Sequence, residues 1–430
     1  MLHGYRGKGG WKPSFPLIGP KAGLLNPEKI LLSVFAPEGR DNPYPALAGL
    51  REVAPVYYSV TISSHFLTTF AGCQAVLTGP DFLVPDREWC ERRIPEGIGR
   101  PAADFFYSSM LATNHDAHDR LRRLVVRELS ARRVAALRAR VEELGAELLD
   151  AFAEAAAGGA VADFYELVAL PLPVAMVGEL IGVPRADQQG LSLLGDDAAR
   201  LLEPVRTPED WARADRGVGG LRTYFAGLLH ERRSRPADDL ASALAMGPLT
   251  DSAGLTDDEL VDVLVLMFAA GFETTAAMLG MAVHALLSHP EQWALLRRRP
   301  ELVPAALEES LRWDAPVPMT ERITARATEV AGVPLPAGAS VIAVMAAAHR
   351  DPEVFADPDA FTIGRQDGRV LSFSAGAHYC VGTALARLEG AVLLRQLLHR
   401  LPRLTPSGPP TRRTGDGLRG FTRLPLALAG

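Results

Sequence analysis

The stretch FSAGAHYCVG, Phe373–Gly382, surrounds one cysteine with small residues and decides how the rest of the chain is interpreted. Gly376 stands four residues before Cys380 and Gly382 two residues after it. A cysteine that only fills a core needs no such clearance, so we expect a large group to approach the backbone here. Three uses are open for Cys380: a buried structural cysteine, a nucleophile with His378 as its base, or a thiolate ligand of a metal.

The overall composition predicts a soluble globular protein. Of the 430 residues, 48% are hydrophobic and 22% are charged, and the formal net charge of −6 provides no basic field for nucleic acid. Only 3 cysteines occur, Cys73, Cys90 and Cys380, too few and too widely spaced for a disulfide framework or a CxxC-type zinc site. We therefore expect a reducing, intracellular compartment and no nucleic-acid partner.

Two segments bear on the relation to membranes. The N-terminal MLHGYRGKGGWKPSF carries positive charge without an apolar segment behind it, so it does not have the form of a signal peptide. The longest apolar run, VLVLMFAAGF (Val263–Phe272), is too short to span a bilayer and is followed by Glu273. The chain is predicted to be cytoplasmic, without a membrane partner, and to have a loosely ordered segment over about residues 1–20.

Helical periodicity dominates the chain. Between Ala131 and Ala157, apolar residues recur at spacings of three and four, which predicts one amphipathic helix that ends at Gly158-Gly159. Thr256, with Glu259 three residues later, has the form of a capping box that opens a long helix, apolar on nearly every side and therefore buried in a large core. Further helices are expected to start at Pro290 and to run from Pro304 to Trp313.

Strand signals are short and few. The stretch VAPVYYSVTI (Val53–Ile62) is rich in β-formers, and Gly332–Met345 predicts two strands around the turn Pro336-Ala337-Gly338. Since helices clearly outnumber strands, we expect a mainly α protein with small β-sheets. Residues 1–430 are predicted to form a single domain.

The cysteine stretch and its continuation, FSAGAHYCVGTALARLE, resemble the haem-binding loop of the cytochromes P450. The positions that match the family pattern are Phe373, Gly376, His378, Cys380 and Gly382. Ser374 stands where the family usually has glycine, and Val370 where many soluble members carry a histidine. The resemblance implies haem b (iron protoporphyrin IX), with the Cys380 thiolate as axial iron ligand and the haem between this loop and the long central helix.

A polar pair interrupts that central helix in AGFETT, Ala270–Thr275. Taken alone, Glu273 and Thr274 could be a satisfied polar pair in a core helix, because buried polar groups are costly unless they are paired. The resemblance implies instead that Thr274 hydrogen-bonds at the oxygen site and that Glu273 relays protons. Ala270 and Gly271 would then let the haem approach the helix.

Basic residues recur where the family binds the haem propionates. In HDRLR, His118 and Arg122 lie at i and i+4 on one helix face, which by itself indicates no more than a solvated basic stripe. The resemblance implies that His118 and Arg122 bind the propionates together with Arg322 and His378.

Glu309 and Arg312, an i,i+3 pair in EESLR, would by themselves predict a surface ion pair of well under ~1 kcal/mol. The resemblance implies a buried, structural pair with Arg365 as its third partner. The matches follow the family order from His118 to Cys380, and they identify the chain as a member of the soluble, bacterial type of cytochrome P450.

The resemblance implies a monooxygenase that hydroxylates or epoxidises a small organic substrate with electrons from a separate ferredoxin and ferredoxin reductase. The substrate is expected to be a natural-product intermediate (a polyketide, a macrolide or an aromatic acid) that is either free or tethered to a carrier protein, and the enzyme is expected to be a monomer. The pocket residues expected from the family positions are Met319, Thr320, Phe421 and Thr422.

Two other activities remain open at this point. A peroxide-using or oxidative coupling haem-thiolate enzyme is disfavoured by the presence of Glu273 with Thr274, since peroxide users of the family tend to lose that pair. A non-catalytic haem protein that only binds a ligand does not need Glu273 and Thr274 for proton delivery. The presence of the pair therefore disfavours this alternative as well.

Overall fold

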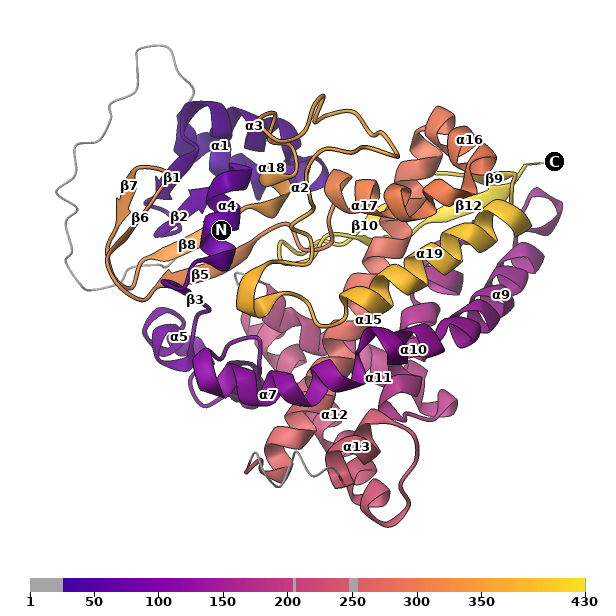
Figure 1. Ribbon diagram of the computed structural model, residues 1–430, viewed down its shortest axis with the longest axis horizontal. Helices are drawn as coiled ribbons and strands as arrows, with labels where there is room; N and C mark the ends of the chain where they lie inside the picture. Colours follow the sequence, from indigo (N-terminus) through magenta and orange to yellow (C-terminus); the bar gives the residue numbers. More distant parts are fainter. Residues whose placement is uncertain (1–25, 204–205, 247–253, 430) are drawn as a thin grey trace.

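The computed structural model describes residues 26–203, 206–246 and 254–429, so the expected loose segment 1–20 lies outside the described residues. Figure 1 shows a sheet with α1 and α3 on one side of the molecule and a larger helical part on the other. The helices are α1 (Pro27–Val34), α2 (Pro37–Asp41), α3 (Tyr44–Val53), α4 (Phe70–Thr78), α5 (Arg87–Arg93), α6 (Pro101–Ser108), α7 (His115–Glu128), α8 (Ala131–Ala136), α9 (Arg138–Ala155), α10 (Pro171–Ile181), α11 (Arg185–Ala198), α12 (Pro208–Ser234), α13 (Leu240–Met246), α15 (Asp257–Ser288), α16 (Pro290–Arg298), α17 (Val303–Trp313), α18 (Met345–Ala348) and α19 (Thr383–Arg400).

The long helix α15 forms the centre of the helical part, as predicted. Its N-terminus has the expected capping box: the Thr256 hydroxyl accepts from Glu259 N at 3.3 Å, and the Glu259 carboxylate accepts from Thr256 N at 2.9 Å. The helix is long and apolar enough to cross a membrane, but 78% of its most apolar window is buried inside the protein. Such burial on all sides is the pattern of a core helix.

The strands form small sheets. They are β1 (Val56–Ser59), β2 (Ser64–Leu67), β3 (Phe82–Leu83), β4 (Ala162–Asp163), β5 (Thr320–Thr324), β6 (Thr328–Val330), β7 (Val333–Leu335), β8 (Ser340–Ala343), β9 (Leu404–Pro406), β10 (Thr411–Arg412), β11 (Phe421–Arg423) and β12 (Pro425–Leu428). The largest sheet has the order β1-β2-β8-β5-β3 and is antiparallel except for the β2–β8 pair. In its β5–β8 register Arg322 lies opposite Val341, and β10 pairs with β11 as a separate antiparallel hairpin.

Three sequence predictions of elements need correction in detail. The helix expected over 131–157 is two helices, α8 and α9, which meet at Leu137, where the backbone N–H bonds to Val134 O three residues earlier. The strand expected over 53–62 contracts to Val56–Ser59, because α3 continues through Val53. The two strands expected between Gly332 and Met345 exist, but β7 pairs with β6 whereas β8 belongs to the large sheet.

Candidate functional site

The cysteine loop ends at the start of α19 with its thiol exposed. Cys380 N donates to Phe373 O at 2.9 Å, and the Thr383 hydroxyl donates to Cys380 O at 2.8 Å. The other two thiols are buried, and burial raises the pKa of Cys90 to about 11 and that of Cys73 still further. Cys380 is therefore the one cysteine of the three that can meet a ligand without rearrangement.

Two residues of this loop adopt left-handed backbone conformations. Gly376 has φ 70°, and a Cβ there would lie 2.4 Å from Leu77 O of α4, so only glycine fits. Ser374 has φ 61° although it carries a side chain. The family glycine that the sequence lacks at 374 thus falls on a position whose backbone favours glycine.

A pair of histidines lies beside the cysteine. The rings of His118, on α7, and His378, in the loop, have centroids 4.3 Å apart. His118 Nδ1 lies 3.1 Å from the Asp119 carboxylate, whereas its Nε2 is buried and, within the described ranges, has no hydrogen-bond partner. Burial, then the nearby charges of His118, Arg322 and Arg122, lower the pKa of His378 to about 3. A buried ring nitrogen without a partner indicates that a polar group of a ligand belongs here.

The guanidinium groups expected at the propionates also meet this loop. Arg122 Nη2 donates to Tyr379 O at 2.6 Å. Arg322 is 3% exposed and donates to Thr320 Oγ1 and Glu321 O, with a longer contact of 3.4 Å to Ser374 Oγ. Burial lowers its pKa to about 10, and none of the carboxylates that the structure describes forms an ion pair with it.

These residues fit a cofactor that carries carboxylates. A buried guanidinium without an anion is costly, and the cost is offset when a ligand supplies the opposite charge. Arg322 and Arg122 supply hydrogen-bond donors from β5 and α7 to one side of the Cys380 loop, and His118 on α7 adds a buried Nε2 that has no hydrogen-bond partner among the described residues. The two propionates of a haem have the charge and the acceptor atoms that this set lacks.

The central helix α15 has one short stretch that is partly exposed, which we call the window. Ala269, Ala270, Gly271 and Thr274 are partly exposed, whereas most of α15 is buried. Thr274 Oγ1 donates to Ala270 O at 3.1 Å, the one-turn bond expected of a helical threonine. A Cβ at Gly271 would lie 2.8 Å from Val177 Cγ2, so this glycine lets α10 pack closely against α15.

Glu273 is not part of this exposed window. Its carboxyl group is buried and forms an ion pair with Arg413, Oε1 to Nη1 at 3.0 Å. Burial raises the pKa of Glu273 to about 8 even though Arg413 opposes the shift. Arg413 carries no signal in the sequence, because it lies 140 positions away on the C-terminal hairpin and belongs to no motif.

The pair Glu309–Arg312 is buried, with side chains 2% and 1% exposed. All five N–H donors of Arg312 are engaged, two with the Glu309 carboxylate and three with the carbonyl groups of His349, Pro358 and Ala360. Arg365 Nε lies 3.4 Å from Glu309 Oε2, in the place expected for the third partner. The interpretation as an exposed surface pair is thus wrong.

Two hydrogen bonds that the sequence does not predict connect the start of the cysteine loop to the residues around the Glu309–Arg312 pair. Leu371 N donates to His349 Nε2 at 2.7 Å, and the Ser372 hydroxyl donates to Leu311 O at 2.9 Å. His349 is fully buried, and burial with the neighbouring Arg312 lowers its pKa to about 3. A neutral His349 can therefore accept from the loop backbone.

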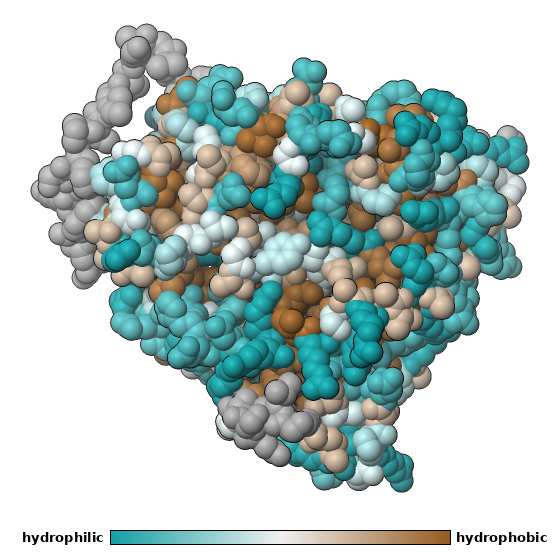
Figure 2. Space-filling view, in the orientation of Figure 1, coloured by the Kyte–Doolittle hydropathy of each residue, from teal (hydrophilic) through white to brown (hydrophobic). Residues whose placement is uncertain are grey.

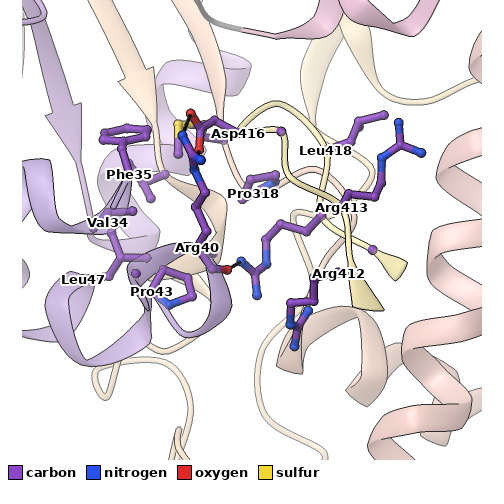
Figure 3. Close-up of a pocket in the computed structure, with 17 residues that line it drawn as sticks. Val34, Phe35, Arg40, Pro43, Leu47, Pro318, Arg412, Arg413, Asp416 and Leu418 are labelled. Carbon is purple, nitrogen blue, oxygen red and sulfur yellow. Dashed lines mark hydrogen bonds and ion pairs between the residues drawn. The ribbon is translucent and has the colours of Figure 1, made fainter. Parts of the chain in front are cut away.

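The expected pocket residues separate into two groups. Met319 lines a cavity of about 520 Å³, counting the space open to solvent, between α2 and the segment 412–420. Figure 3 shows Arg40 and Asp416 directed toward one another in this pocket. Arg40 Nε lies 2.6 Å from Asp416 Oδ1. The Thr320 hydroxyl accepts a hydrogen bond from Arg322 and so lies beside the arginines expected at the propionates.

Phe421 and Thr422 do not line this pocket. Phe421 is 1% exposed and packs edge-on against His284 at 5.0 Å, in the wall of a second cavity. Thr422 is exposed and contacts Thr411 O, because neighbouring residues of a strand point to opposite faces.

Proteins of one known family are similar to this chain over most of its length. The sequence model of the cytochrome P450 family matches residues 292–425. The chain is 36% identical over 397 residues to 6-deoxyerythronolide B hydroxylase of Saccharopolyspora erythraea, with 90% of this chain and 96% of that protein covered. It is 35% identical over 392 residues to the cytochrome P450 monooxygenase PikC of Streptomyces venezuelae, with 90% and 91% covered.

Solved structures show the same fold. P450BioI, in complex with an acyl carrier protein ligated to hexadec-9Z-enoic acid, matches with a TM-score of 0.84 and 28% identity, covering 91% of this chain and 99% of that one. CalO2 also matches with a TM-score of 0.84, at 29% identity over 92% and 98% of the two chains. Two curated relatives are more than a third identical to this chain over nine-tenths of its length, and the solved structures share its fold. The chain therefore belongs to the cytochrome P450 family.

Proposed function

We propose that this chain is a haem-thiolate monooxygenase that tailors a small natural product. The observation that carries the proposal is the exposed Cys380 thiol beside the buried Arg322 guanidinium, which has no carboxylate partner in the described chain, and the buried His118 Nε2, which has no hydrogen-bond partner there. Such a site needs a ligand that offers a metal to the sulfur and carboxylates to the cations. Haem b is that ligand, and the family implies it.

In this proposal each residue has a distinct task toward the cofactor. Cys380 would hold the haem iron through its sulfur, and Phe373, Gly376 and Gly382 shape its loop. His118, Arg122, Arg322 and His378 receive the propionates. Glu309, Arg312 and Arg365 hold the segment below the loop rigid. When bound, haem supplies the iron chemistry that activates dioxygen.

Two residues of α15 handle protons. The Thr274 hydroxyl donates to Ala270 O, sits in the partly exposed window, and would be able to donate its proton to a polar group bound there instead. Glu273, one residue before it, is protonated near neutral pH because burial raises its pKa to about 8. A general acid works best when its pKa is near the working pH.

Electrons would come from a separate ferredoxin and its reductase. Arg123 and Arg127 are exposed on α7, the helix that contacts the cysteine loop, and Figure 2 shows mostly hydrophilic side chains over this helix. A basic, polar surface near the cofactor suits a transient encounter with an acidic electron carrier. We further propose that the enzyme is cytoplasmic, monomeric and folded as one domain over residues 1–430.

The substrate is proposed to be a polyketide, macrolide or similar natural-product intermediate that is hydroxylated or epoxidised. Relatives named as a 6-deoxyerythronolide B hydroxylase and a nocardicin C N-oxygenase support this class. The carrier-protein complex of P450BioI supports a carrier-tethered substrate as one form of delivery. Met319 would contact the substrate, and Thr320 would support the wall behind it.

The decisive experiment is the reduced, carbon-monoxide-bound difference spectrum of the purified protein with haem. We expect the red-shifted Soret band of a thiolate-ligated haem, and its loss in Cys380→Ala. A band typical of histidine ligation, or no bound haem, contradicts the proposal.

Turnover with a surrogate ferredoxin system then separates the other two activities. Product formed with dioxygen and reductant supports the monooxygenase. Product formed only with added peroxide identifies a peroxide user, and ligand binding without any product identifies a non-catalytic binding protein.

A further inference from the structure

Glu273 shares one guanidinium with a second carboxylate. Arg413 Nη1 lies 3.0 Å from Glu273 Oε1, and Arg413 Nη2 lies 3.3 Å from Asp196 Oδ1 on α11. The β10–β11 hairpin holds Arg413 in place, because its backbone N–H donates to Gly420 O at 3.1 Å. One arginine thus bridges the central helix and α11.

The two carboxyl groups differ in their access to solvent. The Glu273 side chain is 3% exposed, and its second oxygen, Oε2, is buried without a hydrogen-bond partner in the described part of the chain. The Asp196 side chain is 39% exposed, and its Oδ2 lies 2.9 Å from Arg213 on α12. A buried acid with one unused oxygen therefore lies next to an acid that water can reach.

The charges of this cluster determine where a proton resides. The groups that face Glu273 are Arg413 from the hairpin, Asp196 from α11 and Tyr165 from the π-helical turn η3 (Tyr165–Ala169). Burial first, and then the like charge of Asp196, raise the pKa of Glu273 to about 8. Burial acts on Asp196 in the same sense, but Arg413, a hydrogen bond with Glu273, Arg200 and Arg213 outweigh it and lower its pKa. At neutral pH the shared proton therefore rests on Glu273 while Asp196 is ionised.

We propose that Asp196, Arg413 and Glu273 form one proton-exchange unit that reloads Glu273 from the partly exposed side of α11. The inference rests on the proposed function, because only an oxygenase consumes the proton that Glu273 releases toward Thr274. Asp196 takes a proton from water and passes it to the Glu273 carboxylate, so that both groups return to their starting charge. Arg413 is a positioning residue that keeps the two carboxyl groups close without transferring a proton itself.

Neighbouring aspartates provide a matched pair of variants. Asp197 adjoins Asp196 on α11 and binds Arg213 at 2.6 Å and Arg216 at 2.8 Å, and among the described residues it has no ion pair with Arg413. Asp196→Asn and Asp197→Asn each remove one charge from the same helix and leave a side chain of the same shape. Asp196→Asn alone interrupts the unit.

The first readout is the titration of Glu273, followed by the infrared band of its protonated carboxyl group and assigned by the loss of that band in Glu273→Gln. We expect a midpoint near 8 in the unmodified protein. We expect Asp196→Asn to lower the midpoint by about one unit, Arg413→Met to raise it, and Asp197→Asn to leave it unchanged. This measurement requires no turnover. Equal midpoints in Asp196→Asn and Asp197→Asn overturn the inference.

The second readout is coupled turnover with a surrogate reductase in H2O and D2O. We expect Asp196→Asn to reduce product formation roughly tenfold and to enlarge the solvent isotope effect, with less loss than the 10²–10⁴ of a group that itself delivers the proton. Asp197→Asn should match the unmodified enzyme. Unchanged turnover and isotope effect in Asp196→Asn overturn the reloading role even if the titration moves.

The two proposals fail separately. A thiolate-type carbon-monoxide spectrum together with identical behaviour of the two aspartate variants overturns the proton-exchange unit only. The absence of that spectrum overturns the monooxygenase and, with it, the reloading role that rests on it.

Discussion

The strongest stability prediction concerns Arg312→Met, which keeps an apolar stem but removes every donor of the guanidinium. In the native protein this side chain is 1% exposed, and its five N–H groups bond to the Glu309 carboxylate and to three backbone carbonyl groups. The substitution removes this donor from the buried His349 carbonyl, at about 1 kcal/mol, and at a smaller cost from the part-buried carbonyls of Pro358 and Ala360, the latter of which keeps a bond from Arg365. Breaking a buried ion pair adds roughly 3–5 kcal/mol.

Two contacts that Glu309 keeps in the variant reduce the expected loss of stability. Glu309 retains the Thr362 backbone N–H at 2.7 Å and the longer contact with Arg365 at 3.4 Å. We therefore expect a loss of about 5 kcal/mol in the free energy of unfolding, a large share of the roughly 5–15 kcal/mol that stabilises a typical protein.

The assay is urea unfolding of the purified haem protein, with Arg299→Met as the control. Arg299 forms an exposed pair with Glu301, with side chains 58% and 62% exposed, so its loss should change stability by less than about 0.5 kcal/mol. Arg312→Lys keeps the charge but not the fork of donors, and should fall between the two. A loss below about 1.5 kcal/mol in Arg312→Met, at an unchanged denaturant dependence, would refute the reasoning from the five bonds.

Three further predictions follow from the loop, α15 and α19. Thr274→Ala should bind haem normally but divert electrons to hydrogen peroxide, which is measured as peroxide formed per reductant consumed; fully coupled turnover would remove Thr274 from proton delivery. Ser374→Gly relieves a left-handed backbone at φ 61°, worth about 1 kcal/mol, against a similar loss from the more flexible unfolded chain, so thermal unfolding should move little; a marked loss would show that the 3.4 Å contact with Arg322 matters. Burial raises the pKa of Glu389, fully buried on α19, to about 8. Because its folded pKa exceeds its unfolded value of about 4.5, folding takes up a proton, and stability should fall by up to about 3 kcal/mol as pH rises from 5 to 8. Glu389→Gln should remove that slope, and an unchanged slope in the variant would mean that Glu389 is ionised when buried.

The sequence by itself determined the features that depend on local order along the chain. The capping box at Thr256 and Glu259 sets where α15 begins, and the apolar character on all its sides requires a buried position. The cysteine loop could be identified from residues within one short stretch, because glycine and cysteine have few substitutes at such positions. Family membership followed from these motifs, and the comparisons confirmed it.

Which distant groups meet depends on how the helices and the hairpin pack in three dimensions. Arg413 and Asp196 lie in unrelated stretches, and packing of α11, α15 and the hairpin brings both to Glu273. Likewise, the residues that surround Gly271 depend on which side of α15 is covered by α10. Hydrophobic periodicity cannot specify that side on a helix that is apolar all round. Charge pairing and close contact are set by three-dimensional packing, so the partners of Glu273 become visible only when the chain is folded.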